Sequence, residues 1–137
     1  MANSIPRTRR KAWANTIAAK TLKCALFVNL TGYDELTATT YAVLVSGGAT
    51  EASGTGYTTG GVTLTNVASS NLATNGAKIS ADPAVWTSAS FSFRYAVIYD
   101  SSSGSIEAIL DAGSSKTVTG GTVTITFDST YGFIKVI

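Results

Sequence analysis

The chain has 137 residues, a length that suits one domain with a single core. Only 13% of the residues are charged, and Ser, Thr and Gly are abundant, a composition that favours β-structure. The sequence has no His and one Cys, which argues against imidazole catalysis, thiolate zinc sites and intrachain disulfides. We therefore expect no catalytic, metal or cofactor site. No apolar window reaches the ~18 residues of a membrane span.

The basic charge of the chain is concentrated at its N-terminus. Residues 1–23 contain six basic residues and no acid, whereas the remainder contains four basic and eight acidic residues. Residues 1–11 lack apolar periodicity, so we predict an extended basic arm, and residues 12–22 are compatible with a short helix. The cluster in the arm comprises Arg7, Arg9, Arg10 and Lys11.

We predict that this arm, with Trp13 beside it, contacts an acidic protein surface; a solvated tail is the alternative. Specific nucleic-acid binding is not expected, because the rest of the chain lacks a basic stripe. Lys20 and Lys23 interrupt the following apolar stretch, so no export signal is expected. A lone Cys24 within an apolar run is then expected to be a small buried side chain in a protein made in a reducing cytosol.

From residue 23 onward, alternating apolar and polar residues separated by turn signals predict a single β-domain over 23–137. About eight short strands without a long helical pattern indicate an all-β, antiparallel sandwich or jelly-roll-like fold. The segments 49–60 and 68–76 are expected to be loops. The predicted strands are 23–30, 41–46 (where a short helix is also compatible), 61–67, 77–80, 91–99, 106–111, 122–128 and 133–137.

The strongest strand, 91–99, alternates so that its apolar side chains are expected on one face, with Arg94 on the other. A half-buried arginine usually pairs with a carboxylate, so we expect Arg94 to form a structural ion pair with Asp82, Asp100 or Asp111. The apolar face would comprise Phe91, Phe93, Tyr95, Val97 and Tyr99.

A glycine-rich segment precedes the predicted strand 61–67. It resembles a phosphate-binding loop at first sight, but it lacks the Lys-Ser/Thr ending and leads into a strand rather than a helix. We therefore interpret it as a structural loop in which glycines permit a tight backbone and Tyr57 caps the sheet. The residues of this loop are Gly54, Gly56, Tyr57, Gly60 and Gly61.

Two further features, the adjacent acids and the two tryptophans, do not indicate a catalytic site. Asp34 and Glu35 are adjacent, so on a strand they would face opposite sides; we expect a solvated loop rather than an acid–base dyad. Trp13 and Trp86 are either core residues or contact points for another chain, and the position of Trp13 beside the arm favours a contact there.

Several motifs, in their order and spacing, resemble a family of small β-rich structural proteins of tailed bacteriophages, found among virion, capsid-decoration and head-fibre type proteins. The resemblance covers residues 13–137 and departs in the basic arm at 1–11 and in a shortened region around 29–45. The motifs are Trp13-x-x-Thr16-Ile17, Thr21-Leu-Lys-Cys-Ala-Leu26, the segment Glu51–Thr65, Trp86, and Arg94-Tyr-Ala-Val-Ile-Tyr-Asp100.

The resemblance implies a non-enzymatic protein of the virion, assembled in the host cytoplasm. We expect a capsid decoration or cement protein that binds the major capsid protein or another virion protein and forms a trimer or ring. A tail, neck or fibre-base component is the first alternative. A carbohydrate-binding module that uses Tyr33, Tyr57 or Trp86 as sugar platforms is the second. A hydrolase is disfavoured by the lack of His and of paired carboxylates.

Overall fold

The computed structural model describes residues 6–72, 76–130 and 132–136, and this part of the chain forms two helices and eight strands. All strand pairs within the two sheets are antiparallel, which confirms the predicted all-β, antiparallel class. The finer expectation of a sandwich or jelly-roll stays a prediction. The elements are α1 (Arg7–Ala18), β1 (Leu22–Asn29), α2 (Tyr41–Ser46), β2 (Thr50–Glu51), β3 (Val62–Thr63), β4 (Ala68–Asn71), β5 (Ala77–Ser80), β6 (Ala84–Asp100), β7 (Ile106–Ile125) and β8 (Ile134–Val136).

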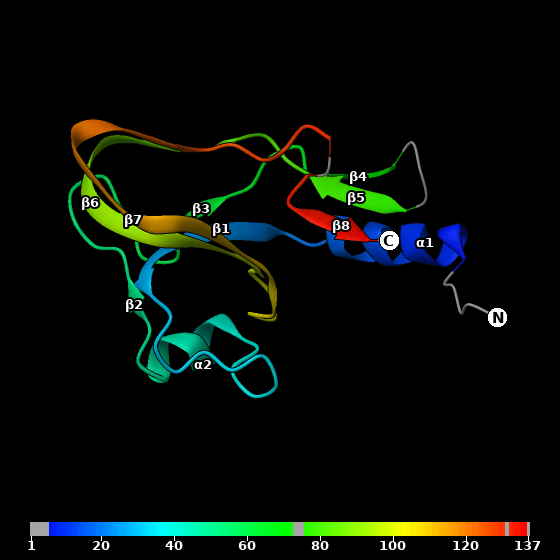
Figure 1. The fold of residues 1–137 in the computed structure, drawn as a ribbon, viewed down its shortest axis with the longest axis horizontal. Coiled ribbons are helices and arrows are strands. Elements are labelled where there is room, and N and C mark those ends of the chain that lie inside the picture. Colours follow the sequence, from blue (N-terminus) through cyan, green and yellow to red (C-terminus); the bar gives the residue numbers. More distant parts are fainter. Residues whose placement is uncertain (1–5, 73–75, 131, 137) are drawn as a thin grey trace.

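The larger sheet is built around β1 and the long β6–β7 hairpin (Figure 1). Its strand order is β2-β1-β6-β7, and β3 also pairs with β1. The hairpin strands have 17 and 20 residues: β6 extends the predicted strand 91–99 toward the N-terminus, and β7 joins the predicted strand 106–111 to the first part of the predicted strand 122–128. Their register shifts at several points, including the stretch around Ser88, a non-glycine residue with a φ of 50°. Such bulges bend a hairpin, and Figure 1 shows β6 and β7 curling together.

The curl changes which side chains of β6 face the main core. Trp86, Phe91 and Phe93 belong to this core, and so does Ile98. Val97 instead faces a second core on the other side of the sheet. The prediction that the apolar side chains at alternate positions from Phe91 to Tyr99 share one face is therefore wrong. The register shift between Phe93 and Tyr95 is the physical reason, because a bulge inverts the alternation beyond it.

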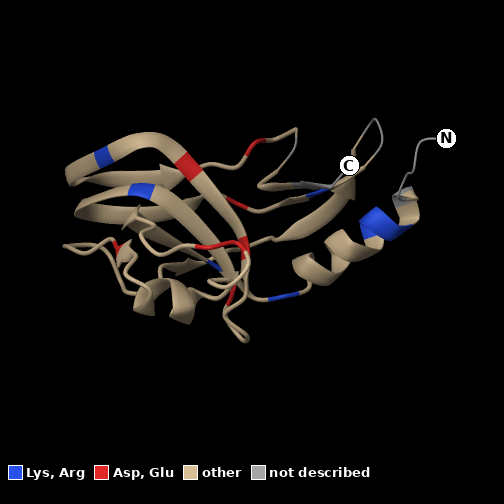
Figure 2. Ribbon diagram, turned by 60° about the horizontal axis from the view of Figure 1, so that its bottom comes forward, with Lys and Arg blue, Asp and Glu red and all other residues tan. Residues whose placement is uncertain are grey.

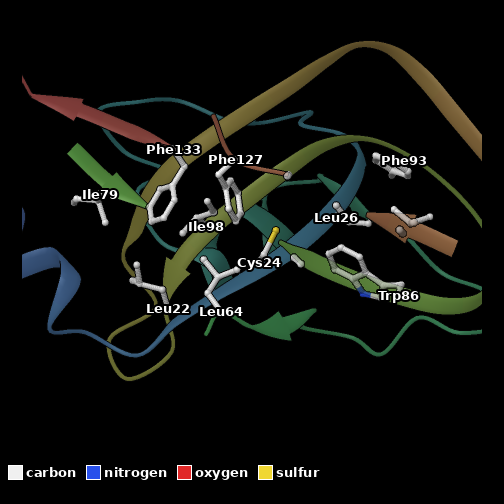
Figure 3. Packing of buried hydrophobic residues seen from close by; sticks show 14 of the residues in the cluster. Leu22, Cys24, Leu26, Leu64, Ile79, Trp86, Phe93, Ile98, Phe127 and Phe133 are labelled. Atoms are coloured by element: carbon white, nitrogen blue, oxygen red, sulfur yellow. The ribbon is translucent and has the colours of Figure 1, made fainter. Parts of the chain in front are cut away.

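The smaller sheet, β4-β5-β8, is packed against α1 at one end of the molecule (Figure 1). Its side chains and those of the larger sheet form one continuous core. Figure 3 shows Ile79 and Phe133 on one side of this core, and Cys24, Leu26 and Trp86 extending it along β1 and β6. Helix α1 therefore packs on the same apolar interior as the strands, to which it contributes Ala14 and Ile17.

Helix α2 covers the second core, where Leu44 packs with Phe27 and Val97. Residues 41–46, whose β-branched residues predicted a strand with a helix as the alternative, are helical. The side chain of Thr40 caps this helix by accepting a hydrogen bond from the Val43 N–H at 3.2 Å. Segments predicted as loops also contain the short strands β2 and β4, whose polar sequences carry little β signal.

Candidate interaction surface

The predicted extended arm is helical: α1 begins at Arg7 and continues to Ala18. Its buried stripe consists of Arg10, Ala14 and Ile17, which are 6%, 0% and 3% exposed. These positions follow the i, i+4, i+7 spacing of one helix face. The expectation for residues 7–11 was wrong because an arginine occupies the first position of the stripe, where apolar periodicity would have revealed a helix. Residues 1–5 lie outside the described part of the chain.

The four basic residues of the predicted contact point in different directions. Arg9 is exposed, Arg10 is buried among the core residues, and Lys11 is half-buried, with its Nζ donating to Ser69 Oγ of β4 at 2.8 Å. The side chain of Arg7 lies outside the described part. Two of the predicted contact residues therefore hold α1 on the body, and Arg9 is the described basic residue of this cluster that faces solvent.

Trp13 is the most exposed aromatic side chain of the described residues, at 52%, and it follows Arg9 by one helical turn. Residues four apart lie on the same helix face, so the indole and the guanidinium form one outward surface. A hollow of about 310 Å³ lies along another side of α1 and is lined by Thr8, Lys11, Ala12, Asn15 and Asn71. We call the exposed side chains of Arg9 and Trp13 the α1 face.

The α1 face rests on a helix that is fixed at both ends. Near its start, Lys11 donates to Ser69, whose hydroxyl donates in turn to Asn15 Oδ1. Just after its end, Lys20 Nζ lies 2.6 Å from Glu107 Oε1 of β7, and this hydrogen bond raises the pKa of Lys20. The α1 face is thus presented by an ordered helix, which lowers the entropic cost of binding relative to a mobile arm.

Charge is segregated along the molecule. Figure 2 shows Lys and Arg positions on and just after α1, and Asp and Glu positions together with further Lys and Arg positions over the remainder of the fold. The sequence contains no acid before Asp34 and no Lys or Arg between Lys23 and Lys78. This separation creates a basic end and an acidic region within one chain.

The glycine-rich loop closes a gap in the edge of β1. β3 pairs with β1 at Cys24 and β2 pairs with it at Phe27. Between these points the Tyr57 hydroxyl accepts a hydrogen bond from the Leu26 N–H at 2.9 Å. The Tyr57 ring also stacks on Trp86 at 6.3 Å between centroids and meets Phe91 edge-on at 5.3 Å. Tyr57 therefore caps the sheet and supplies a hydrogen-bond partner where no strand does.

The glycines let this loop approach the sheet closely. A Cβ at Gly54 would lie 2.2 Å from the Ser90 carbonyl oxygen, and neighbouring Thr55 forms an isolated bridge with Ser90. The φ of Gly54 is +142°, a conformation that L-residues rarely adopt. Gly56, Gly60 and Gly61 also have positive φ. These contacts are with backbone of the protein itself and give the loop a packing role.

The sequence did not single out Glu51, which organises this loop. Its Oε1 accepts hydrogen bonds from the Tyr57 hydroxyl at 2.6 Å and the Gly60 N–H at 2.7 Å, and its Oε2 accepts one from the Tyr41 hydroxyl at 2.5 Å. Burial, and then the bond to Glu51, raise the pKa of both tyrosines. The sequence feature that could have identified Glu51 is its position as the one acidic residue of a Gly/Thr/Ser loop, between Tyr41 and Tyr57. Chemically, the carboxylate acts as an acceptor that joins α2, β2 and the loop.

Arg94 pairs with Asp111, one of its three predicted partners. Arg94 Nε lies 2.9 Å from Asp111 Oδ1, and Nη2 lies 3.1 Å from Oδ2. The other two candidates are engaged elsewhere: Asp82 accepts from Asn66, and Asp100 accepts from Ser102. The pair spans the hairpin next to the wide bulge of β7 and is a structural contact.

The remaining candidate residues differ in how far they are exposed to solvent. Trp86 is 3% exposed and belongs to the core, whereas Asp34 and Glu35 are exposed in the loop after β1. Cys24 is fully buried, as expected, and burial raises the pKa of its thiol to about 12. In the described ranges, no three His, Cys, Asp or Glu side chains come together as metal ligands.

None of the described helices has the length and apolar character needed to cross a bilayer. Comparisons with protein-family models, curated proteins and solved structures found no match.

Proposed function

We propose that this chain is a non-enzymatic structural protein of a tailed-phage virion that decorates and stabilises the capsid. The proposal is supported by the resemblance of residues 13–137 to small β-rich virion proteins. The observation in the fold that carries it is the α1 face, an indole and a guanidinium held outward on an anchored helix. Trp and Arg are the side chains most often found at the energetic centres of protein–protein interfaces.

The α1 face would bind a subunit of the virion, which is the major capsid protein, another virion protein or a further copy of this chain. The indole of Trp13 would enter an apolar pocket of the partner, and Arg9 would pair with a carboxylate beside it. Because the described part of α1 is already ordered, binding requires little further ordering of the chain. On a shell with many equivalent positions, even a modest contact at each copy contributes to the stability of the whole particle.

The alternative positions in the virion are the tail, the neck and the base of a fibre. The same surface would serve there, since each position requires protein–protein contacts. Copy number separates them, because a decoration protein occupies hundreds of positions and a neck or tail component few. Counting copies in symmetry-resolved images of particles would decide.

A sugar-binding role is less well supported. Of the three aromatic residues expected as sugar platforms, Trp86 is buried and Tyr57 is stacked on it, with its hydroxyl bonded to Glu51. Tyr33, 40% exposed, is the remaining exposed ring of that set. A platform for a saccharide needs an accessible ring face, and only one of the three predicted residues provides one.

The test is occupancy on purified particles that contain variant chains. Trp13→Ala should lower the number of copies per particle several-fold or more, while Val85→Ala, at another exposed apolar position, should not. These substitutions are preferable to deletion of residues 1–11, which would also remove buried Arg10. Full occupancy by a folded Trp13→Ala chain would refute a role of the α1 face in the particle.

A further inference from the structure

A second group of exposed apolar side chains lies outside α1. Of the seven large apolar side chains that are exposed in the described part, five lie between residues 28 and 45. Leu36 is the most exposed of all, at 85%. Exposed apolar side chains mark an interaction site when they lie together, as Tyr33 and Leu36 do in one short loop. The five are Val28, Tyr33, Leu36, Val43 and Val45.

Local hydrogen bonds hold Leu36 outward. The carboxylate of Asp34 accepts from the Leu36 N–H at 2.7 Å, and the Asp34 carbonyl accepts from the Ala38 N–H at 2.8 Å. Ala38 itself is buried, so it anchors the turn from which Leu36 projects. Gly32 packs against the backbone of Gly47 at the end of α2, which places this loop beside the helix. We call the loop residues Tyr33, Asp34, Glu35 and Leu36 the acidic loop.

The acidic loop and the α1 face complement each other. The loop offers exposed Leu36 and Tyr33 beside the carboxylates of Asp34 and Glu35, and the α1 face offers Trp13 beside Arg9. The acidic loop lies in the stretch between Lys23 and Lys78 that lacks Lys and Arg, while α1 lies in the stretch that lacks acids. Opposite charges beside apolar anchors give an interface both register and a steered approach.

We infer that the α1 face of one copy binds the acidic loop of a second copy of this chain. This inference rests on the proposed function and names the partner of its contact surface. Within one copy the two surfaces belong to separate parts of the fold, with α1 at one end of the long axis and α2 with its neighbouring loop away from that end (Figure 1). The contact is therefore between copies and heterologous, and repetition of such a contact generates a ring or a filament.

Mixing two variants tests the head-to-tail arrangement. Trp13→Ala keeps the acidic loop intact, and Leu36→Ala keeps the α1 face intact. For each variant alone, the dissociation constant of the assembly should be about tenfold higher than that of wild type, because every contact then lacks one of its two apolar anchors. An equimolar mixture should form a one-to-one heterodimer and no larger assembly, measured by light scattering and sedimentation.

Cysteine cross-linking gives a second, geometric readout. Thr16→Cys mixed with Thr37→Cys, at exposed positions beside the two anchors, should form a disulfide-linked dimer under mild oxidation, while neither variant should cross-link to itself. The native Cys24 is buried and should not contribute. Val85→Cys, at an exposed position on β6, is the matched control and should not cross-link to either variant.

The possible outcomes separate this inference from the proposed function. Wild-type protein that stays monomeric at high concentration, or association that Trp13→Ala weakens and Leu36→Ala leaves unchanged, would overturn the contact between copies. If Trp13→Ala nevertheless lowered occupancy on particles, the proposed function would stand, with a different virion protein as the partner. Heterodimers in the mixture and the specific cross-link would support the contact.

Discussion

Gly61 lies so close to Cys24 that a side chain on the glycine would overlap the cysteine carbonyl: a Cβ at Gly61 would be 1.9 Å from that oxygen. This approach occurs where β3 joins the edge of β1, at the end of the glycine-rich loop. The φ of Gly61 is also positive, at +76°. The residue is therefore constrained both by backbone conformation and by space.

Gly61→Ala should destabilise the fold strongly. The new methyl group would force β1 and β3 apart, and the alanine would also be strained in a left-handed conformation. We therefore expect the free energy of unfolding to fall by roughly 3 kcal/mol or more. Gly113→Ala is the matched control, since φ there is +84° and no atom lies within 4 Å of the position of its Cβ. That variant should lose only about 1–2 kcal/mol. Chemical denaturation of the two variants measures the difference, and equal losses would show that the close approach is absent.

Tyr57→Phe tests the hydrogen-bond network of Glu51. The substitution keeps the ring on Trp86 but leaves the Leu26 N–H unpaired and removes one donor from Glu51. Leaving buried polar groups unpaired costs about 1–3 kcal/mol, which urea unfolding will detect. Tyr33→Phe, at an exposed ring, should change the free energy of unfolding by less than about 0.5 kcal/mol. A neutral Tyr57→Phe would mean that the hydroxyl is not needed at the edge of β1.

Strong local patterns made much of the sheet predictable. The apolar run 23–30 became part of β1, the first part of the alternating segment 122–128 became the end of β7, and the lone Cys24 in the first of these is buried as predicted. A short run of consecutive apolar residues and a strict apolar–polar alternation are both local signals of a strand. The ion pair of Arg94 was also predictable, because a guanidinium flanked by aromatic residues in a strand requires a carboxylate partner.

The missed features depend on contacts between distant residues. Residues 7–11 are helical, with Arg10 buried on the same helix face as Ala14 and Ile17, and no local pattern shows that this arginine is buried. The partners of Glu51 come from α2 and from the glycine-rich loop, so the network exists only in the folded chain. Arg9 faces solvent, whereas Arg10 is buried and Lys11 bonds to Ser69 of β4, and these different roles are set by the tertiary packing of α1.

The thiol of Cys24 should be inert in the folded protein. The thiol is buried and its pKa is raised from 9.0 to about 12, so little thiolate exists at neutral pH. Alkylation with iodoacetamide at pH 8 should be roughly a thousandfold slower in the folded protein than in guanidinium, in proportion to the thiolate fraction. Above pH 9 the unfolded thiol ionises before the folded one, so stability should also fall as pH rises between 9 and 12. Rapid alkylation under native conditions would contradict the burial of β1.

The ion pair of Arg94 and Asp111 predicts a dependence of stability on acid pH. The hydrogen bond from Arg94, and then that from the Gly113 N–H, lower the pKa of Asp111 below its usual value near 3.8. A lowered folded pKa stabilises the fold above the unfolded pKa, and this contribution is lost as pH falls through the folded value.

Asp111→Asn should therefore lower the melting temperature relative to wild type at pH 6, where the contribution is fully present. The difference should shrink as pH falls below about 3.8, because wild-type Asp111 then takes up a proton and loses its charge. Asp111 lies outside both the α1 face and the acidic loop, so its substitution leaves the proposed contact surfaces unchanged. A melting-temperature difference for Asp111→Asn that stays constant from pH 6 to pH 2.5 would show that the charge of Asp111 does not stabilise the hairpin, and that the bulge of β7 is held by packing and backbone bonds alone.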